Sequence, residues 1–411
     1  MDSKQVKDWV EGRLNPFIDD LKTITNIDSG NGDPEGTGQV ARIIGGWLEA
    51  AGAAVEYRSN DRSTHTIARI KGSGKVRLLL IAHIDTVFAK GEAAKRPFTI
   101  NADLIAQGPG VGDDKATVIQ TIYTMKALQE LGFDNFGEII LYYNGEEEGG
   151  SPTADAIVAE LSQQADLAVI MDTARPNWGI VTQRKGSANY EIEVQGIAGH
   201  HGNSSHHSAS AIMELGNQIS RLYRLASPLP DRPADYTREA LAARGVADHG
   251  QFIPENTINV GVIGSSNQKI NVIPQDAFAK LNVRCFKVAE QERLDREIKA
   301  LATQTMVPGT SVAISGGIET GPMEKTEQVQ KLVDLYKTIV KREYNADVVE
   351  WIAGGITDGN RSAKYIPTID ALGIENYDEH TDHETVDLKT AVPRTVALIL
   401  FIQEVSQSWP L

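Results

Sequence analysis

The sequence of 411 residues has one cysteine, no long apolar run and fewer basic than acidic residues. With Cys285 alone, neither an intrachain disulfide nor a thiolate metal site can form, which fits a reducing compartment. Cys285 stands in an alternating apolar stretch, so we expect a buried strand residue and not a reactive thiol. No run of about 18 apolar residues is present to span a membrane. The N-terminus also lacks a basic segment followed by an apolar one, so a cytoplasmic, unprocessed protein is expected.

The charge balance limits the partners. The chain has 55 Asp and Glu against 40 Lys and Arg, for a formal net charge of −15. A chain of that charge is repelled by nucleic acid and by anionic membranes, so neither is expected as a partner. A small-molecule substrate, neutral or chelated to a metal, is easier to accommodate. The length exceeds that of one usual core and predicts two domains.

The order of patterns predicts an α/β domain with a mostly parallel sheet, interrupted by a smaller α+β domain. In the first part the expected strands are 76–82, 138–143 and 167–171, and the expected helices are 6–24, 40–48 and 115–131. From Arg184 on, the chain favours strands 190–194, 257–262 and 277–286, a helix at 209–225 and a proline-rich loop at 227–233. Helices at 328–344 and 391–405 return to the first pattern. We therefore assign 1–184 and 317–411 to the larger domain, and 185–316 to the inserted one.

Residues that can carry chemistry follow the expected strands. His83 comes directly after the first of them, and Asp85 lies two positions later, on the same side of an extended backbone. An imidazole beside a carboxylate suits a metal ligand and the acceptor that fixes its tautomer. Asp113 and Asp114 follow a glycine-spaced loop, 108–112, which lacks the Gly-Lys-Ser/Thr ending of a phosphate-binding loop. These patterns alone leave a capped strand end and a helix N-cap as alternatives.

Three successive carboxylates, Glu146, Glu147 and Glu148, follow the strand at 138–143. A cation would relieve their mutual repulsion at the end of a buried strand, whereas a solvated charge run is the alternative. Because neighbouring side chains point in different directions, one glutamate can bind a metal while the next reaches a water molecule. Asp172 ends the next strand. Ligands of open α/β sheets bind at the carboxyl ends of the strands, so this edge is the predicted metal site.

His380, four residues before Glu384, completes this ordered series late in the chain. The series as a whole resembles the motifs of the glutamate carboxypeptidase, aminoacylase and succinyl-diaminopimelate desuccinylase family of co-catalytic metallopeptidases, over nearly the whole chain. The resemblance implies a catalytic α/β domain interrupted by a smaller α+β lid that mediates dimerisation, and hence a homodimer. It also implies two divalent metal ions, with zinc expected first and manganese or cobalt as alternatives.

The resemblance further implies roles for individual residues. The metal ligands carried over by position are His83, Asp113, Glu148, Asp172 and His380. Asp113 would bridge the two metals, with His83 and Asp172 completing the first site. Glu148 and His380 would complete the second. Glu147 would be the general base for a metal-activated water, and Asp85 would orient His83.

In the lid, the resemblance implies that His200 reaches the partner subunit's reaction centre and stabilises the tetrahedral intermediate. Residues that would contact substrate or line its pocket are Asn271, Arg284, Gly354 and Gly355. The remaining histidines are expected at the surface, at a dimer contact, behind the ligands or in structural roles: His201, His206, His207, His383, His65 and His249.

One departure concerns the substrate. After the lid, members that select amino acids carry an arginine that grips the substrate carboxylate, whereas residues 315–322 here contain none. This weakens the case for glutamate or another dicarboxylate, although Arg284 can still hold one carboxylate. Our leading hypothesis is hydrolysis of an amide-type C–N bond in a small carboxylate-bearing substrate. The alternatives are an aminohydrolase that releases ammonia from an activated aromatic amine such as a nitroanthranilate, and a non-catalytic metal-containing binding protein.

Overall fold

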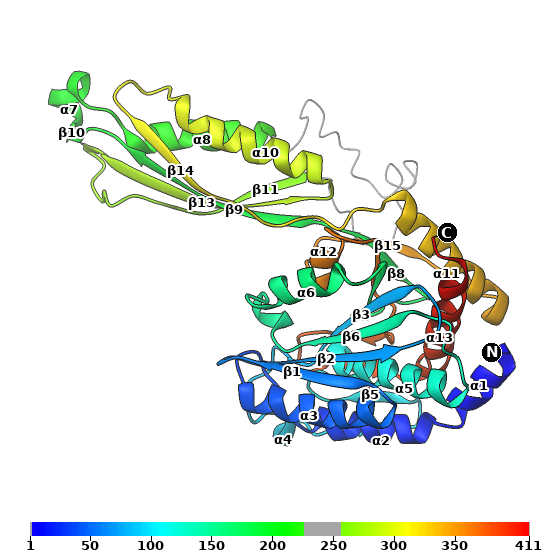
Figure 1. Ribbon diagram of the computed structural model, residues 1–411. Coiled ribbons are helices and arrows are strands. Elements are labelled where there is room, and N and C mark those ends of the chain that lie inside the picture. The colour runs from blue at the N-terminus through cyan, green and yellow to red at the C-terminus, as the bar shows by residue number, and fades with distance from the viewer. Residues whose placement is uncertain (1, 226–255, 411) are drawn as a thin grey trace. The chain divides into compact units, whose positions relative to one another are not determined.

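The computed structural model describes residues 2–225 and 256–410, and the chain divides into two compact units (Figure 1). The first unit comprises Met1–Thr182, Lys325–Trp351 and Thr357–Leu411, and the second comprises Gln183–Glu324 and Ile352–Ile356. The second unit extends past the expected boundary at 316 because the strand β14 (Ser311–Thr320) belongs to its sheet. The proline-rich loop predicted at 227–233 and His249 lie outside the described residues.

The first unit is built on a mixed six-stranded sheet. Its strands, in spatial order, are β1 (Ala54–Ser59), β2 (Thr64–Lys71), β6 (Glu138–Asn144), β3 (Arg77–His83), β7 (Leu167–Ile170) and β16 (Thr368–Ile369). The strands β6, β3, β7 and β16 run parallel. The pair β1–β2 and the pair β2–β6 are antiparallel. The parallel arrangement expected from the sequence therefore holds for the part of the sheet that carries the predicted site, and not for its β1 edge.

Helices cover both faces of this sheet (Figure 1). The helices described in the first unit are α1 (Ser3–Glu11), α2 (Leu14–Thr25), α3 (Pro34–Ala50), α4 (Glu92–Lys95), α5 (Ala116–Glu130), α6 (Ala154–Ser162), α11 (Glu327–Tyr344), α12 (Asp358–Ser362) and α13 (Ala391–Ser408). In β3, Leu78 and Leu80 join the core that holds α5 and α13, whereas Leu79 and Ile81 join the core that holds α6. Because both faces are buried, β3 is a continuous apolar run and does not alternate.

The single opening helix expected at 6–24 is wrong. The chain forms α1 and α2 instead, and α1 ends at Glu11, where the N–H of the C-cap residue Gly12 donates to Asp8 O. Both helices bury apolar residues in the same core, so the apolar spacing continues across the break. Periodicity alone therefore did not show where the first helix ends.

A small four-stranded sheet in the first unit supports two loops of the predicted site. Its strands, in spatial order, are β17 (Asn376–Tyr377), β18 (Thr385–Asp387), β5 (Ile105–Gln107) and β4 (Thr99–Ile100). The glycine loop 108–112 leaves β5 and enters a short π-helical turn, η1 (Val111–Lys115), ahead of α5. His380 lies in the connection between β17 and β18. Since β18 pairs with β5, the two loops start from neighbouring strands.

The second unit is an antiparallel sheet with helices on one face (Figure 1). The spatial order is β11 (Asn256–Gly264), β13 (Asp276–Cys285), β9 (Gly186–Gln195) and β14. The helices α8 (Ala211–Leu225) and α10 (Val288–Ala300) share a core with alternate residues of β9 and β13. Cys285 lies in this core as a buried free thiol, as predicted. Further short elements of this unit are β10 (Gly199–His200), paired with β12 (Val272–Ile273), and α7 (His201–Ser204). The paired strands β8 (Ile180–Arg184) and β15 (Glu350–Ala353) each begin in the first unit and end in the second.

Within residues 2–225 and 256–410, no helix combines the length and the apolar character needed to cross a membrane.

Candidate functional site

Three of the predicted ligands meet at the carboxyl ends of the parallel strands. His83 ends β3, Asp113 lies in η1, and Glu148 follows β6. One ligand atom from each of the three lies within 4.8 Å of the other two. His83 Nε2 is 2.8 Å from Asp113 Oδ1. Among the described residues, these three side chains therefore form a group able to hold a metal ion.

His380 and Asp172 lie at the edges of this group. His380 Nε2 is 3.1 Å from Asp113 Oδ2 and 3.3 Å from Glu148 Oε2, and its side chain is 53% exposed. Its backbone has φ 63°, a left-handed conformation that costs energy for a residue with a side chain and is typical of functional sites. Asp172 follows β7, and its charge raises the pKa values of Asp114 and Glu147 after the larger effect of burial.

Glu384 holds the glycine loop that carries Asp113. Its buried carboxylate accepts hydrogen bonds from the N–H groups of Gly110 at 3.0 Å, Gly112 at 2.8 Å and Asp113 at 3.0 Å. Gly110 has φ 70°, and a Cβ there would lie 2.3 Å from Thr86 Cγ2. This position therefore requires glycine both for its backbone conformation and for its space. Sequence reasoning placed Glu384 in a motif and assigned it no role.

Asp85 anchors the turn that carries the two glutamates of the site. Its Oδ1 accepts from Glu147 N at 2.9 Å and its Oδ2 from Glu148 N at 3.1 Å. Asn31 Nδ2 donates to the same Oδ2 at 3.1 Å. Asp85 Oδ1 also lies 3.5 Å from His83 Nδ1. The fully buried carboxylate of Asp85 thus fixes the backbone of Glu147 and Glu148, a role beyond the one the sequence predicted.

The three successive glutamates have separate partners. Glu146 accepts from Thr153 N and Thr153 Oγ1, both at 2.6 Å, and from Ala154 N at 3.2 Å. It satisfies N–H groups at the start of α6, as an N-cap residue does. Glu147 and Glu148 are left to the site. The acidic triplet is therefore one structural carboxylate followed by two that are available to the site.

The electrostatics of the cluster favour a bound cation. Burial raises the pKa of Glu148 to about 8 and that of Glu147 well above its ordinary value. Burial acts in the same direction on Asp113, but hydrogen bonds from His380 and His83 hold its pKa below the ordinary value. Within the described chain, Glu148 Oε1 and Asp114 Oδ1 are buried without a hydrogen-bond partner. Oxygen atoms of this kind need a cation or a donor, so the residues present fit a metal centre.

The residues predicted from the lid lie in the second unit at two separate places. His200 is exposed on β10, and His201 N donates to Asn271 O at 3.1 Å, so His200 and Asn271 are neighbours at one end of the unit (Figure 1). Arg284 lies eight positions after Asp276 in β13, about 26 Å along an extended strand. The structure does not bring Arg284 together with His200 and Asn271.

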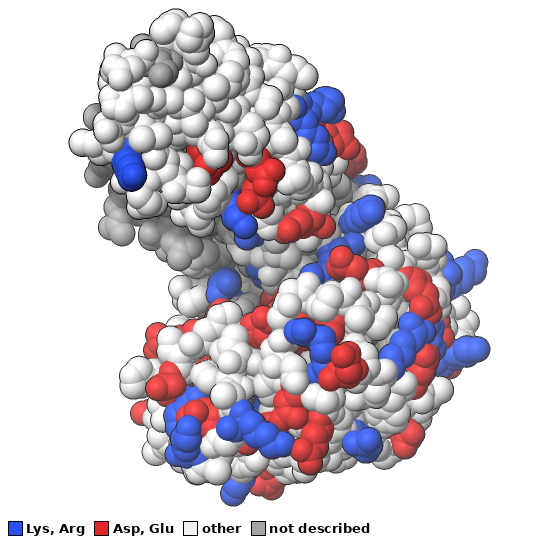
Figure 2. Space-filling view, turned by 90° about the vertical axis from the view of Figure 1, so that its left-hand side faces the viewer, with Lys and Arg blue, Asp and Glu red and all other residues white. Residues whose placement is uncertain are grey.

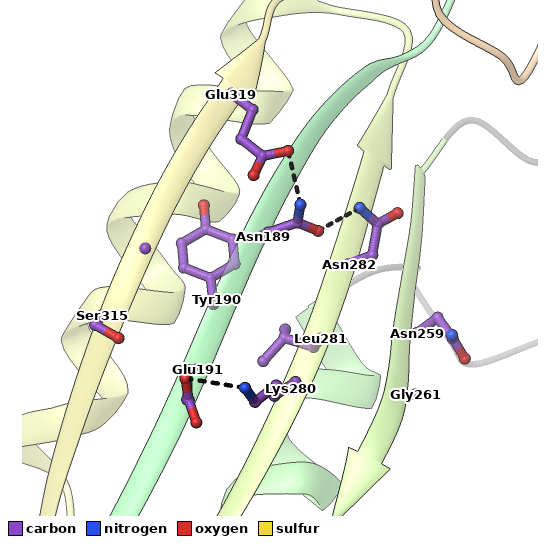
Figure 3. A pocket seen from close by; sticks show the side chains of 11 residues that line it. Asn189, Tyr190, Glu191, Asn259, Gly261, Lys280, Leu281, Asn282, Ser315 and Glu319 are labelled. Atoms are coloured by element: carbon purple, nitrogen blue, oxygen red, sulfur yellow. Dashed lines mark hydrogen bonds and ion pairs between the residues drawn. The ribbon is translucent and has the colours of Figure 1, made fainter. Parts of the chain in front are cut away.

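Arg284 is attached to a row of polar side chains on the sheet face that carries no helix. Arg284 Nε donates to Asn282 Oδ1 at 2.9 Å, Asn282 Nδ2 to Asn189 Oδ1 at 2.7 Å, and Asn189 Nδ2 to Glu319 Oε2 at 2.6 Å. Asn189, Asn282 and Glu319 line an open hollow of about 530 Å³ (Figure 3). We refer to Glu319, Asn189, Asn282 and Arg284 as the polar row. Nothing in the sequence marked its first three members.

The segment without an arginine lies beside this row. Gly316 in β14 has φ 93°, and a Cβ there would lie 2.2 Å from Asn189 O. A side chain at this position would collide with the neighbouring strand. Gly354 and Gly355 follow β15, and a Cβ at either would meet nothing within 4 Å. Their predicted place in a substrate pocket stays a prediction.

The histidines without an assigned role divide by burial. His201, His206, His207 and His383 are exposed. His65 is buried in β2, where its Nδ1 accepts from Gly145 N at 3.2 Å and its Nε2 lies 3.1 Å from Thr153 Oγ1. His65 is thus a structural residue with hydrogen-bond partners.

Comparison with known proteins agrees with this geometry. The sequence profile of peptidase family M20/M25/M40 matches residues 79–404. Carboxypeptidase G2 of Pseudomonas sp. (strain RS-16) is 27% identical over 387 residues, which cover 92% of this chain and 86% of that protein. A succinyl-diaminopimelate desuccinylase of Gluconacetobacter diazotrophicus is 25% identical, over 78% of this chain and 80% of that protein.

Solved structures share the fold at low identity. Aminopeptidase PepT of Bacillus cereus superposes with a TM-score of 0.73 at 15% identity, covering 95% of this chain and 98% of that one. The YXEP protein of Bacillus subtilis, described as a dinuclear metal-binding peptidase, superposes with a TM-score of 0.67 at 15% identity, covering 97% and 99%.

Proposed function

The chain belongs to peptidase family M20/M25/M40 and is a metal-dependent hydrolase of C–N bonds, and on that premise we propose its reaction and its substrate class. We propose hydrolysis of an amide-type C–N bond in a small carboxylate-bearing substrate, with Glu147 as the general base. One observation carries this proposal. Glu147 and Glu148 are fixed side by side by Asp85, and Glu148 lies in the metal-binding group with His83 and Asp113.

Two divalent metal ions are proposed as cofactors. Asp113 would be shared, and the other ligands would be His83 with Asp172, and Glu148 with His380. Imidazole and carboxylate ligands without thiolate suit zinc, and also manganese or cobalt. When bound, such ions polarise the scissile carbonyl group and lower the pKa of water.

The residues of the chain supply the proton transfers and the orientation. Glu147 accepts a proton from the attacking water and returns it to the leaving nitrogen. Asp85 holds Glu147 at its backbone N–H, and it holds the His83 ring in place from the Nδ1 side. Glu384 fixes the backbone of Asp113. Two buried carboxylates, Asp85 and Glu384, therefore set the positions of the base and of its neighbouring proposed ligands before any substrate arrives.

We propose that the protein acts as a homodimer in which His200 and Asn271 serve the partner subunit. Both lie at the end of the second unit away from Arg284. Large apolar side chains are exposed near this end: Ile197 is 47% exposed, Met213 is 69% exposed, and Ile270 is fully exposed. Mixing inactive His200→Ala and Glu147→Gln proteins should restore activity, because one kind of site in the mixed dimer would be complete. Mixtures that stay inactive while dimers form would contradict a shared site.

The substrate is proposed to be small, with one carboxylate held by Arg284. On the face in Figure 2, Lys and Arg side chains lie among Asp and Glu side chains without a continuous basic surface. That surface and the net charge of −15 support a small molecule over nucleic acid as the partner. The free buried thiol of Cys285 supports a reducing, cytoplasmic location.

The test is a substrate panel with the metal-reconstituted enzyme. The protein would be loaded with zinc, manganese or cobalt and assayed against N-acyl amino acids, dipeptides and aromatic amines such as a nitroanthranilate, following carboxylate and ammonia release. We expect release of a carboxylate and an amine from an N-acyl amino acid or dipeptide. If the enzyme released ammonia from the aromatic amine and turned over none of the other substrates, the aminohydrolase alternative would replace our proposal. No turnover of any substrate with two ions bound would overturn the C–N hydrolase mechanism.

A further inference from the structure

The turn that carries Glu147 and Glu148 has a second anchor besides Asp85, made by residues more than 200 positions later in the chain. We propose that Asp358 and Arg361, on α12, are positioning residues that hold this turn in its active geometry. This proposal rests on the proposed function, because the proposed function makes Glu147 the general base and Glu148 a metal ligand. It adds two residues that are neither ligands nor bases.

Asn144, the last residue of β6, joins α12 to the turn. Its Nδ2 donates to Asp358 Oδ2 at 2.9 Å and to Ser151 Oγ at 3.0 Å. Its Oδ1 accepts from Glu146 N at 3.0 Å. Asn144, Ser151 and Asp358 are all buried, so each of these bonds forms where no water replaces it. The side chain of Asp358 thereby fixes the side-chain amide of Asn144. The oxygen of that amide in turn holds Glu146 N, at the start of the turn.

Arg361 holds the far end of the same turn. Its Nη2 donates to Gly150 O at 3.1 Å, its Nη1 to Asp358 Oδ1 at 3.2 Å, and its Nε to Asp155 in α6. The Arg361 side chain is only 9% exposed. Three acceptors in different directions match the rigid fork of a guanidinium, which a lysine cannot reproduce. The turn from 144 to 150 is thus held at both ends from α12, while Asp85 holds its middle.

A purely structural role predicts a different outcome, and the chain offers a matched control. Arg69 pairs with Glu138 at 3.2 Å, and Glu138 is the first residue of β6 whereas Asn144 is the last. Arg69 and Arg361 therefore both pair with carboxylates, Arg69 at the start of β6 and Arg361 with Asp155 and Asp358 beside the turn that follows β6. Removing either should lower the stability of the first unit, but of the two only Arg361 touches the turn.

The experiment compares Arg361→Met, Arg361→Lys, Asp358→Asn and the control Arg69→Met in the full-length metal-loaded enzyme. Four quantities would be measured: kcat, KM, the zinc dissociation constant by competition with a chromophoric chelator, and the melting temperature. Groups that orient metal ligands from behind typically change activity or metal affinity by about 10- to 100-fold. We expect Arg361→Met to lose that much in kcat or zinc affinity with little change in KM. Arg361→Lys should recover part of the loss, and Arg69→Met should stay within about twofold of the wild type.

Equal kcat and zinc affinity for Arg361→Met and Arg69→Met would overturn the proposal, whatever their melting temperatures. A loss in Arg361→Met that shows only in the melting temperature would also overturn it. Failure of the proposed function looks different, because the wild-type enzyme would then turn over no C–N substrate. Zinc affinity would still report on the turn, since Glu148 lies within it and belongs to the metal-binding group.

Discussion

Carboxylates and amides build two polar regions of this molecule, and they are held in different ways. At the strand ends of the first unit, Asp85 and Glu384 are buried and accept hydrogen bonds from backbone N–H groups. In the polar row of the second unit, Asn189 and Glu319 are exposed and bond mainly to other side chains. Backbone donors are fixed by the fold, whereas exposed side chains exchange partners with water at little cost. We infer that the first region fixes the chemistry and the second adapts to the substrate.

The largest effect is expected at the centre of the first region. Glu147→Gln keeps the size of the side chain and its backbone hydrogen bond to Asp85, but the amide cannot accept a proton. Activity should fall by about 10²- to 10⁴-fold, the usual contribution of a general base. Metal content, measured by plasma emission spectroscopy, should not change. Normal turnover in a variant with normal metal content would remove Glu147 from the mechanism.

A change behind the ligands should have the next largest effect. Glu384→Ala leaves the N–H groups of Gly110, Gly112 and Asp113 without their acceptor, at about 1–3 kcal/mol each before water enters. The glycine loop should then loosen, and metal affinity should fall by about 10- to 100-fold. Isothermal titration with zinc would measure this. An unchanged zinc dissociation constant would show that metal binding does not need the hydrogen bonds that Glu384 accepts from the backbone. The inferred difference between the buried region and the polar row would then be wrong.

The meeting of His83 and Glu148 could be predicted because their signal is local. His83 and Glu148 follow the parallel strands β3 and β6, which are buried on both faces, and β3 therefore reads as a continuous apolar run. Parallel strands place their carboxyl ends at one edge of the sheet, so residues that directly follow such strands are expected to lie close together in space. A polar residue after an apolar run was sufficient for His83 and Glu148, whereas Asp113 and His380 follow the short strands β5 and β17.

The supporting residues could not be predicted because their partners are distant in the chain. Glu384 bonds to Asp113, 271 positions away, and Arg361 bonds to Gly150, 211 positions away. No local pattern records such pairs. The end of α1 was missed for a different reason, since α1 and α2 pack on one core and keep one apolar period across Gly12. The position of β14 in the second unit is likewise set by its pairing with β9.

A smaller and selective effect is expected at the polar row. Arg284→Ala should raise KM by roughly 10- to 100-fold for substrates with a free carboxylate, because a hydrogen bond to a charged group is worth about 1.5–3 kcal/mol. The corresponding amides should be affected little, and kcat should be retained. Glu191→Gln is the matched control, since Glu191 lies on β9, pairs with Lys280 at 3.5 Å and stands outside the row. Equal KM changes for acids and amides would mean that Arg284 does not hold the carboxylate.

The smallest effect is expected at His65, a buried histidine of the first unit that lies outside the metal-binding group. Burial lowers the pKa of His65 below its ordinary value of 6.5. As the pH falls through 6.5, the unfolded chain takes up a proton that the folded chain does not, so the folded state loses stability until the lower pKa is reached. The His65→Gln variant lacks this pH-dependent loss of stability. Its melting temperature should therefore fall less than that of the wild type between about pH 7.5 and 5.5. Loss of metal in acid affects both proteins alike. Parallel curves of melting temperature against pH would therefore mean that His65 is protonated equally in the folded and the unfolded state.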